Sequence, residues 1–387
     1  MEAFQGARIK WPYVTHLIDP RLVTSVLPPV EETNPGSLVL ARVVTIGRHR
    51  DLENQAGRRM ALFPGDVFVG VLGNRYATDQ FEGLGRCSGT QGHILGIGGV
   101  VGEVTSMNNR MTEPTVIEWL GRLAGPDGKP LHLSQFHLIQ APTSRARRAT
   151  TILSLGASMN SGKTTTAAQM IRSLTVAGHR VAAAKVTGTA CRKDPNFLYD
   201  AGAVAVLDFT HAGWPSTADC SLEELLSIAS DLRAALAAHD PEFVVLEIAD
   251  GIVQRETAMM LADAGFQDSI DAVTFAGVDA LSCDAGVRRL HALGYNVLAT
   301  AGMVANGSLG IAEAEASSGI QCLNGESIIA GALVPALRAI READGDAALA
   351  SDAGAHVRAA VGSSPAASAA DVAPAPFPNR DLPSDWR

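Results

Sequence analysis

The segment Leu153–Ala168, LSLGASMNSGKTTTAA, constrains the fold of this chain more than any other stretch. An apolar run ends in a loop of small residues, and a helical pattern begins directly after Gly162 and Lys163. A buried strand, a loop of bare backbone amides and a helix N-terminus together bind anions, because the amides point inward and the helix dipole favours negative charge. A lysine at this position reaches terminal phosphates, and the hydroxyl of Thr164 is placed to ligate Mg²⁺. The segment therefore predicts a phosphate-binding loop, or P-loop.

The loop departs from the usual pattern G-x-x-x-x-G-K-[ST] at its first position. Ala157 stands where the first glycine belongs, and Gly156 comes one place early. Because alanine is the smallest replacement, we expect the turn to survive. The alternative is a glycine-rich turn that caps an ordinary helix. Strand, loop, GKT triplet and helix nevertheless follow one another in the order that the motif requires.

Composition argues against several classes of protein. A length of 387 residues suggests two or three domains, and 18% charged with 47% hydrophobic residues is typical of a globular protein. The net charge of −9 argues against nucleic-acid binding by the chain as a whole. Residues 1–30 contain no signal-peptide pattern and no apolar window reaches about 18 residues, so we expect a cytoplasmic protein without a membrane span. The five scattered cysteines form no C-x-x-C pair, which argues against a disulfide scaffold and a zinc ribbon.

Changes in composition divide the chain into regions, and a basic polar stretch at 142–149 marks the main boundary. The last region is rich in Ala, Ser and Pro and has too few large apolar residues to offset the entropy of ordering. The predicted regions are an irregular lead-in (1–36), a β-rich domain (37–145), a P-loop α/β domain (150–342) and a disordered tail (343–387).

The β-rich domain contains short apolar runs separated by Gly and Pro turns, which favours a small barrel or sandwich. Between these runs the polar segment 73–83 carries Arg75, whose guanidinium suits an anionic substrate. A solvated loop is the alternative for this segment. The apolar runs are SLVLARVVTIG (37–47), VFVGVLG (67–73), HILGIGGVVGEV (93–104), TVIEWLGRL (115–123) and HLSQFHLIQ (132–140).

From residue 150 onward strands alternate with helices, which predicts a parallel sheet with right-handed crossovers. The apolar run FVVLEI (243–248) is typical of a central strand buried on both faces. Ser221 and Glu224 have capping-box spacing at the start of a helix. We therefore predict an α/β fold, in which a parallel-sheet P-loop NTPase domain follows a smaller β-rich domain. The other expected elements are strands at 150–155, 180–186, 204–209, 271–276, 296–303 and 320–323, and helices at 163–177, 222–238, 254–264, 280–293, 309–318 and 325–342.

Each P-loop residue has an expected role. Lys163 would neutralise charge on the β- and γ-phosphates, Thr164 would hold Mg²⁺, and Thr165 would contact the α-phosphate. The residues whose amides would cradle phosphate oxygens are Ser158, Asn160, Ser161 and Gly162.

Two acids form a second candidate group. Glu247 lies at the end of the predicted strand 243–248, and Asp250 follows in the loop. Ligands of open α/β sheets bind at the carboxyl ends of the strands. Glu247 is therefore predicted to hold Mg²⁺, and both acids are candidate catalytic groups. The alternative is that they cap the next helix or remain solvated.

The segment after the second strand, KVTGTACRKDPNFLYDAGA, is rich in cations and hydroxyls. It should reach the same sheet edge as the P-loop, where it would bind an anionic co-substrate or nucleotide phosphates. A charged surface loop is the alternative. His211, which follows the third strand, is a further candidate, as a general base. The candidates in the segment are Lys185 as a catalytic group, Asp194 as a second Mg²⁺ ligand, and Thr187, Arg192 and Lys193 as substrate contacts.

The order of these features resembles the SIMIBI class of P-loop NTPases, and within it dethiobiotin synthetase and the molybdopterin-guanine-dinucleotide accessory protein MobB. The shared order, over roughly 150–300, is the P-loop, a strand ending in Lys185, a loop leading to D-A-G-A (200–203) and a strand ending in Glu247. The resemblance implies nucleotide binding and a second strand next to the P-loop strand. Ile248 stands where the class has a glycine, and the signature lysine early in the P-loop is absent.

Together these features predict an enzyme that uses Mg²⁺ and ATP, or GTP, to activate a small anionic metabolite by phosphoryl transfer to a carboxylate, as a kinase or ligase does. Three alternatives remain open. They are an NTPase that matures or delivers another enzyme, a CoA-dependent acyltransferase on a P-loop fold, and a non-catalytic nucleotide-binding module. We expect no nucleic-acid partner, and a homodimer is open.

Overall fold

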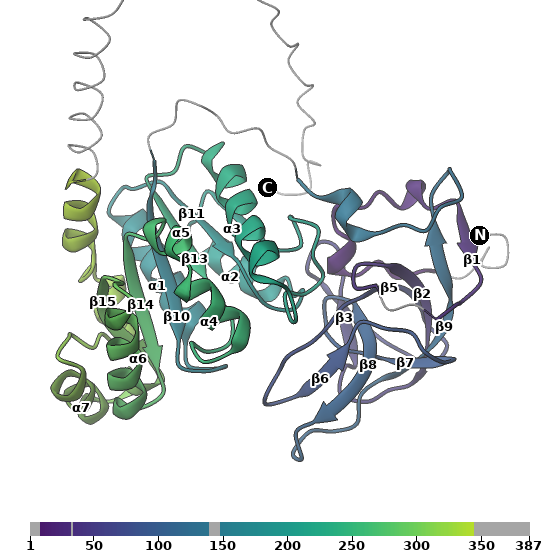
Figure 1. Ribbon diagram of the computed structural model, residues 1–387, viewed down its shortest axis with the longest axis horizontal. Coiled ribbons are helices and arrows are strands. Elements are labelled where there is room, and N and C mark those ends of the chain that lie inside the picture. The colour runs from purple at the N-terminus through teal and green to yellow at the C-terminus, as the bar shows by residue number, and fades with distance from the viewer. Residues whose placement is uncertain (1–7, 32–33, 139–147, 344–387) are drawn as a thin grey trace, which may run out of the picture. The chain divides into compact units, whose positions relative to one another are not determined.

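The computed structural model describes residues 8–31, 34–138 and 148–343 (Figure 1). A β-rich sheet and a six-stranded parallel sheet lie within one compact unit, Met1–Arg341. This is the predicted fold class, a P-loop α/β sheet preceded by a β-rich part. Most of the basic stretch 142–149 and the predicted disordered tail from 344 onward lie outside the described residues.

The β-rich part forms a closed barrel. Strand β7 pairs with both β8 and β9, which closes the order β9-β2-β5-β8 into a ring. Strands β5 and β8 are parallel, and the other ring neighbours are antiparallel. The strands are β1 (Ser25–Leu27), β2 (Leu38–Thr45), β3 (Asp51–Glu53), β4 (Arg59–Ala61), β5 (Val67–Leu72), β6 (Phe81–Leu84), β7 (Gln91–Ile94), β8 (Val100–Met107) and β9 (Val116–Ala124).

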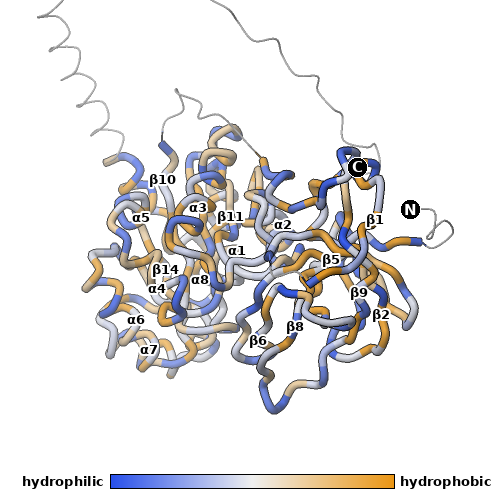
Figure 2. The backbone as a smooth tube through the Cα atoms, turned by 45° about the vertical axis from the view of Figure 1, so that its right-hand side comes forward, coloured by the Kyte–Doolittle hydropathy of each residue, from blue (hydrophilic) through white to orange (hydrophobic). Residues whose placement is uncertain are grey.

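One hydrophobic core takes alternate side chains from all five ring strands, among them Val39, Phe68, Ile94, Val101 and Ile117. In Figure 2 the strands β2, β5 and β9 carry long hydrophobic stretches, shown in orange. The apolar runs separated by Gly and Pro turns therefore build a barrel rather than a sandwich.

The lead-in contributes strand β1 to the barrel sheet and is otherwise packed against the barrel with little regular structure. It contains two 3₁₀ helices, η2 (Tyr13–Thr15) and η3 (Pro20–Leu22). Tyr13, Val14 and Ile18 are buried in a core that also contains side chains of β2 and β5. The few apolar residues between the prolines thus cover an apolar surface of the barrel.

The second sheet is parallel throughout, in the order β12-β11-β13-β10-β14-β15. The P-loop strand β10 lies between β13 and β14. The second strand, β11, is therefore not its neighbour, and the adjacency implied by the resemblance is wrong because β13 lies between them. The strands are β10 (Thr150–Gly156), β11 (Val181–Lys185), β12 (Ala205–Asp208), β13 (Phe243–Glu247), β14 (Ala272–Gly277) and β15 (Val297–Gly302).

Helices cover both faces of this sheet (Figure 1). Leu153 and Leu155 of β10 pack in a core with α3, α4 and α6, whereas Ile152 packs in a core with α1 and α2. The helices are α1 (Lys163–Val176), α2 (Lys193–Asp200), α3 (Leu222–Ala237), α4 (Arg255–Ala262), α5 (Ala264–Asp268), α6 (Ala280–Ala292), α7 (Ser308–Ser318) and α8 (Gly325–Ile329).

Several local expectations need correction. Helix α2 occupies a segment expected to be a loop, and Pro195 is tolerated there because it lies in the first turn, where its missing N–H has no intrahelical partner. The run 93–104 forms two strands rather than one, and the apolar run 132–140 contains a 3₁₀ helix, η4 (Leu133–Phe136). Cys322 forms a single bridge where a strand was expected at 320–323. The last expected helix is broken at Gly331, which separates α8 from helical residues 334–343.

Other local signals act as expected. Ser221 and Glu224 form the predicted capping box of α3. Gly178, just after α1, has a φ of +89°, the left-handed conformation in which glycine ends helices. None of the described helices combines the length and apolarity needed to cross a bilayer.

Candidate functional site

The segment between β10 and α1 follows the strand, loop and helix order of a P-loop. Gly162 has a φ of +105° and Asn160 a φ of +59°, so both adopt the left-handed conformation that turns the chain into the helix. A side chain on Gly156 would place its Cβ 2.4 Å from Ser161 Oγ and 2.5 Å from the Ala276 carbonyl oxygen. The close approach that demands a glycine therefore falls at Gly156, one place before its usual position in the motif.

Two neighbouring loops press against the P-loop backbone. A Cβ on Gly251 would lie 2.1 Å from the Ala157 carbonyl oxygen, and one on Gly302 would lie 2.3 Å from that of Ser161. The amide of Met303 donates a 3.0 Å hydrogen bond to the same Ser161 carbonyl. The loops after β13 and β15 thus hold the P-loop in place.

Lys163 is folded back over the loop that precedes it. Its buried ammonium donates a 2.6 Å hydrogen bond to the Ser158 carbonyl oxygen. Burial lowers the pKa of Lys163 to about 8, although Glu247 and Asp250 act in the opposite direction. A phosphate oxygen would offer this ammonium a stronger acceptor than a carbonyl does.

Thr164 and Glu247 are in direct contact. Thr164 Oγ1 donates a 2.7 Å hydrogen bond to Glu247 Oε1. The side chain of Glu247 is only 1% exposed, and its second oxygen, Oε2, is buried without a hydrogen-bond partner among the described residues. A hydroxyl beside an unsatisfied carboxylate is a donor set that suits a hard divalent cation.

Lys185 joins the same group from the end of β11. Its ammonium pairs with Asp194 and lies 3.7 Å from Glu247 Oε1. Burial opposes the charge on the lysine, but Glu247 and Asp194 raise the pKa of Lys185 above its ordinary value. Burial also acts to raise the pKa of Asp194, but the attraction of Lys185 outweighs it, so the pKa of this carboxyl lies below its ordinary value. A Mg²⁺ ion at Asp194 would have to displace this lysine, so the predicted metal role of Asp194 stays a prediction.

Asp250 lies in the loop after β13. Its φ of +60° is the left-handed conformation, uncommon for a residue other than glycine. Burial raises the pKa of Asp250 to about 6, against the effect of Lys163 and Lys185. A carboxyl with such a pKa can exchange a proton near neutral pH.

A cavity of about 970 Å³ opens over these residues. Loops and the two-stranded sheet β3–β4 of the β-rich part line it on one side, which we call the barrel wall. Residues of the P-loop part line the other side, the P-loop wall. The predicted site residues that line it are Arg75, Asn160, Gly162, Lys163, Thr164, Thr165, Lys185, Lys193, Asp194, Glu247 and Asp250.

The barrel wall reaches the tip of the P-loop. Asn160 Nδ2 donates a 2.9 Å hydrogen bond to Asp79 Oδ2, and the Thr78 hydroxyl lies 3.9 Å from the sulfur of Met159. Both contacts come from the polar segment 73–83, which is therefore part of the site rather than a solvated loop. Arg75, in the same segment, is held by the Leu95 carbonyl and by a 2.9 Å hydrogen bond to Gln80 Oε1.

Two predicted substrate contacts lie away from the main cavity. Thr187 Oγ1 accepts a 2.9 Å hydrogen bond from the Ala249 amide and lines a smaller pocket. The guanidinium of Arg192 lies 5.4 Å from the centre of the Tyr13 ring, and its backbone amide donates to Glu53. Arg192 is turned towards the lead-in because Tyr13 offers an aromatic face there. Ser158 and Ser161, two of the predicted cofactor-binding residues, are also not among the residues that line the cavity.

Sequence reasoning missed most of the barrel wall. Besides the segment 73–83, the cavity is lined there by the run Gly47–Asp51, which includes Arg48, His49 and Arg50, and by Arg59. The cluster G-R-H-R-D directly after a strand was the available signal, but the register of the barrel decides which way such a loop faces. The glycines that support the P-loop, Gly251 and Gly302, gave no signal of their own.

His211 lies in a buried network, not at the cavity. Its Nδ1 is 3.0 Å from Asp208 Oδ1, and the Tyr13 hydroxyl donates a 2.7 Å hydrogen bond to Asp208 Oδ2. His16 Nε2 is 3.2 Å from His211 Nε2, and burial lowers the pKa of His16 to about 4. This network joins the lead-in to the end of β12, and His211 is not among the residues that line the cavity.

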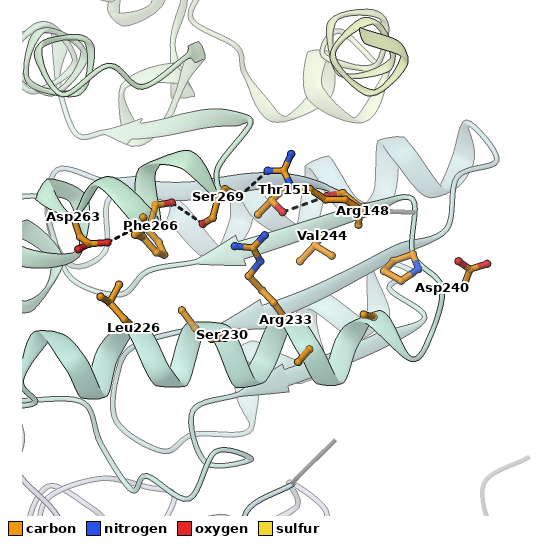
Figure 3. Close-up of a pocket in the computed structure, with 16 residues that line it drawn as sticks. Arg148, Thr151, Leu226, Ser230, Arg233, Asp240, Val244, Asp263, Phe266 and Ser269 are labelled. Atoms are coloured by element: carbon orange, nitrogen blue, oxygen red, sulfur yellow. Dashed lines mark hydrogen bonds between the residues drawn. The ribbon is translucent and has the colours of Figure 1, made fainter. Parts of the chain in front are cut away.

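A second cavity, of about 590 Å³, lies at the opposite end of the strands (Figure 3). Thr151 and Val244, close to the starts of β10 and β13, line it together with α3 and α5. Figure 3 shows Arg233 extending from α3 into this space. Because ligands of open α/β sheets bind at the carboxyl ends of the strands, the cavity at Lys163 is the candidate site.

The described residues contain no cluster of three or more His, Cys, Asp or Glu side chains that would hold a metal by themselves. Mg²⁺ bound with a nucleotide needs fewer protein ligands, because phosphates and water complete its octahedral shell. The hydroxyl of Thr164 and the free Oε2 of Glu247 fit such an ion.

No family model and no curated protein matches the sequence. Among solved structures, the chain is 18% identical to the 54 kDa signal recognition particle protein from Aeropyrum pernix in complex with GDP, over 55% of this chain and 53% of that one, with a TM-score of 0.35. A DUF1611 family protein from Anabaena variabilis is 12% identical over 52% of this chain and 63% of that one, with a TM-score of 0.36. The cell division protein FtsY from Thermotoga maritima is 16% identical over 51% and 69%, with a TM-score of 0.34. The chain thus spans about half the length of the first of these structures, and similarity of this degree says nothing about activity.

Proposed function

We propose that this protein is an enzyme that binds Mg²⁺ and ATP at the P-loop and transfers the γ-phosphoryl group to a carboxylate of a small anionic metabolite. The hydrogen bond from Thr164 to Glu247, beside the unsatisfied Glu247 Oε2, is the observation that carries this proposal. A site for the phosphates of CoA would need cations and amides, but no buried acid next to the P-loop hydroxyl.

The residues have distinct parts in the proposed reaction. A carboxylate oxygen of the metabolite attacks the γ-phosphorus while the bond to the bridging oxygen breaks, and ADP leaves with that electron pair. No proton has to be removed from the attacking group. Lys163 and the loop amides neutralise charge that builds up on the phosphate oxygens, and positioning supplies much of the rate. Mg²⁺ held by Thr164 and Glu247 would add charge stabilisation when bound.

Isothermal titration of the full chain with Mg·AMP-PCP tests the first half of the proposal. We expect binding that Lys163→Ala weakens at least a hundredfold. Lys129→Ala, which removes an exposed lysine of the barrel, is the matched control. Titrations with Mg·GMP-PCP and acetyl-CoA run beside it. Binding of acetyl-CoA without binding of either nucleotide would identify an acyltransferase site instead.

Release of phosphate in the presence of small carboxylates tests the second half. We expect one class of carboxylate to raise turnover of ATP, and Lys163→Ala to abolish that rise. Turnover that responds only to an added protein would indicate a maturation or delivery factor. Nucleotide binding without turnover under any carboxylate would indicate a non-catalytic module. Either result contradicts the proposed reaction.

A further inference from the structure

The two walls of the cavity differ in charge. On the P-loop wall three lysines are matched by three carboxylates, whereas on the barrel wall four arginines stand against one carboxylate. The positive excess among the described lining residues therefore lies on the barrel wall. The charged residues are Lys163, Lys185, Lys193, Asp194, Glu247 and Asp250 on the P-loop wall, and Arg48, Arg50, Arg59, Arg75 and Asp51 on the barrel wall.

The barrel arginines are largely unneutralised by the protein. Asp51 lies 3.6 Å from Arg59. Arg48 and Arg50 are exposed, and neither forms an ion pair within the described part of the chain. The guanidinium of Arg75 is oriented by the Leu95 carbonyl and by Gln80, yet its Nε is buried without a hydrogen-bond partner among the described residues. Within the described chain, the barrel wall therefore has two exposed, unpaired guanidinium groups, those of Arg48 and Arg50, and a buried N–H donor of Arg75 without an acceptor.

Arg48 and Arg75 also act on each other. Burial lowers the pKa of Arg75, Asp79 and Asp250 act against that effect, and the charge of Arg48 adds to it. The positive charges of Arg48 and Arg75 repel each other. An anionic ligand beside Arg48 and Arg75 would offset this repulsion.

We propose that the barrel wall binds the second substrate, and that this substrate is a small molecule with two anionic groups. Arg75 holds one group, and Arg48 with Arg50 holds the other. The inference rests on the proposed function, since it assigns the P-loop wall to the nucleotide. A nucleotide binds together with Mg²⁺, and the lysines and carboxylates of the P-loop wall already match in number. The excess positive charge of the barrel wall is therefore left to bind a different anion. Ligand cavities span roughly 300–1,000 Å³, so the 970 Å³ here is large enough for two small ligands.

Calorimetric titration of the full chain, saturated with Mg·AMP-PCP, tests this inference. The probes are succinate, butyrate and phosphonoacetate, which compare a dicarboxylate, a monocarboxylate of equal carbon number and a mixed dianion. Arginine pairs with both carboxylate and phosphate through two parallel hydrogen bonds. We expect succinate or phosphonoacetate to bind at least tenfold more tightly than butyrate, and the tighter of the two indicates the kind of anion preferred.

Variants assign the binding to the barrel wall. The double variant Arg48→Gln/Arg50→Gln should weaken the preferred dianion at least tenfold and change the affinity for Mg·AMP-PCP less than threefold. Arg75→Gln should act in the same way. If that variant fails to fold, Arg75→Lys keeps the charge, loses the fork geometry and is expected to weaken the dianion too. Arg110→Gln, which removes an exposed barrel arginine that does not line the cavity, is the matched control.

Three results would overturn the inference. The first is equal affinity for succinate and butyrate, and the second is unchanged affinity for the dianion in Arg48→Gln/Arg50→Gln. The third is an equal loss of affinity for Mg·AMP-PCP and for the dianion in that variant, which would show that the nucleotide binds to the barrel wall. If the wild-type protein does not bind AMP-PCP at all, the proposed function fails. The same dianion titrations without nucleotide then still decide whether the arginines form an anion site.

Discussion

Thr164 and Glu247, 83 residues apart in the chain, meet through a 2.7 Å hydrogen bond between hydroxyl and carboxylate at the carboxyl edge of the parallel sheet. The contact arises because β10 and β13 are neighbours, with Ser154 paired to Glu247 in register. It places the first residue after the P-loop lysine beside a buried acid that retains one free oxygen. A cation that joined both oxygen atoms would take over the hydrogen bond.

Glu247→Gln is expected to remove the dependence of nucleotide binding on Mg²⁺. An amide keeps the shape of the side chain but loses the charge that a hard cation requires. Titration of AMP-PCP should show a loss of at least tenfold with Mg²⁺ present and a change of less than threefold in EDTA. Asp194→Asn, measured in parallel, tests the predicted second ligand, because a true ligand shows the same metal-selective loss. Wild-type affinity of Glu247→Gln in Mg²⁺ would contradict a metal role for this acid.

Asp250 is expected to make stability depend on pH in a definite direction. Its pKa is about 6 in the folded protein against an ordinary value of 3.8, so the folded chain holds the extra proton between these values. The free energy of unfolding therefore falls as pH rises from about 4 to 6 and then levels off. Asp250→Asn has no carboxyl at this position and therefore lacks this loss of stability at higher pH. Asparagine also tolerates the φ of +60° there.

Urea unfolding without nucleotide, between pH 4 and 8, measures this effect. The advantage of Asp250→Asn over the wild type should grow through the window to at most about 3 kcal/mol, at about 1.4 kcal/mol for each pKa unit. Asp240→Asn makes the same replacement at an exposed residue whose φ is also positive, at +47°. An advantage that is the same at pH 4 and pH 8 would contradict the raised pKa of Asp250.

The contact between Asp79 and Asn160 is expected to couple the barrel to the P-loop energetically. A hydrogen bond to a carboxylate contributes about 1.5–3 kcal/mol when well formed and less at an exposed site. A double-mutant cycle with Asp79→Ala and Asn160→Gly, followed by urea unfolding, should give a coupling energy of about 0.5–2 kcal/mol. Glycine suits the φ of +59° at residue 160, so this variant tests the hydrogen bond rather than backbone strain. Additive effects of the two replacements would contradict a direct contact in solution.

Tyr13→Phe is expected to destabilise the protein although Tyr13 does not line the cavity. The replacement removes a 2.7 Å hydrogen bond to Asp208, a buried carboxylate, at a cost of about 1–3 kcal/mol. Tyr199→Phe is the matched control, because Tyr199 is 62% exposed and its loss should change stability by less than about 0.5 kcal/mol. Equal midpoints for the two variants in urea would mean that the lead-in does not fasten to β12 as described.

Local signals in the sequence were sufficient for most elements and for the P-loop. The strand before Gly156, the helix after Lys163 and the capping box of Ser221 and Glu224 each depend on residues within a few positions of one another. Backbone preferences and hydrophobic periodicity act over that range, so they can be recognised without a structure. The same reasoning brought Glu247 and Asp250 to the sheet edge, because the carboxyl ends of parallel strands converge there.

Contacts between distant residues were decided only by the tertiary structure. Strand order places β13 rather than β11 beside β10, and barrel closure turns Arg48 and Arg50 towards the cavity. Tyr13 reaches Asp208 across 195 positions of sequence. No single segment carries a preference for such contacts, since they follow from how whole surfaces pack once the elements exist. The sequence by itself therefore determined the strand, loop and helix of the P-loop pattern, while the packing of the barrel against that loop decided which cations share its cavity.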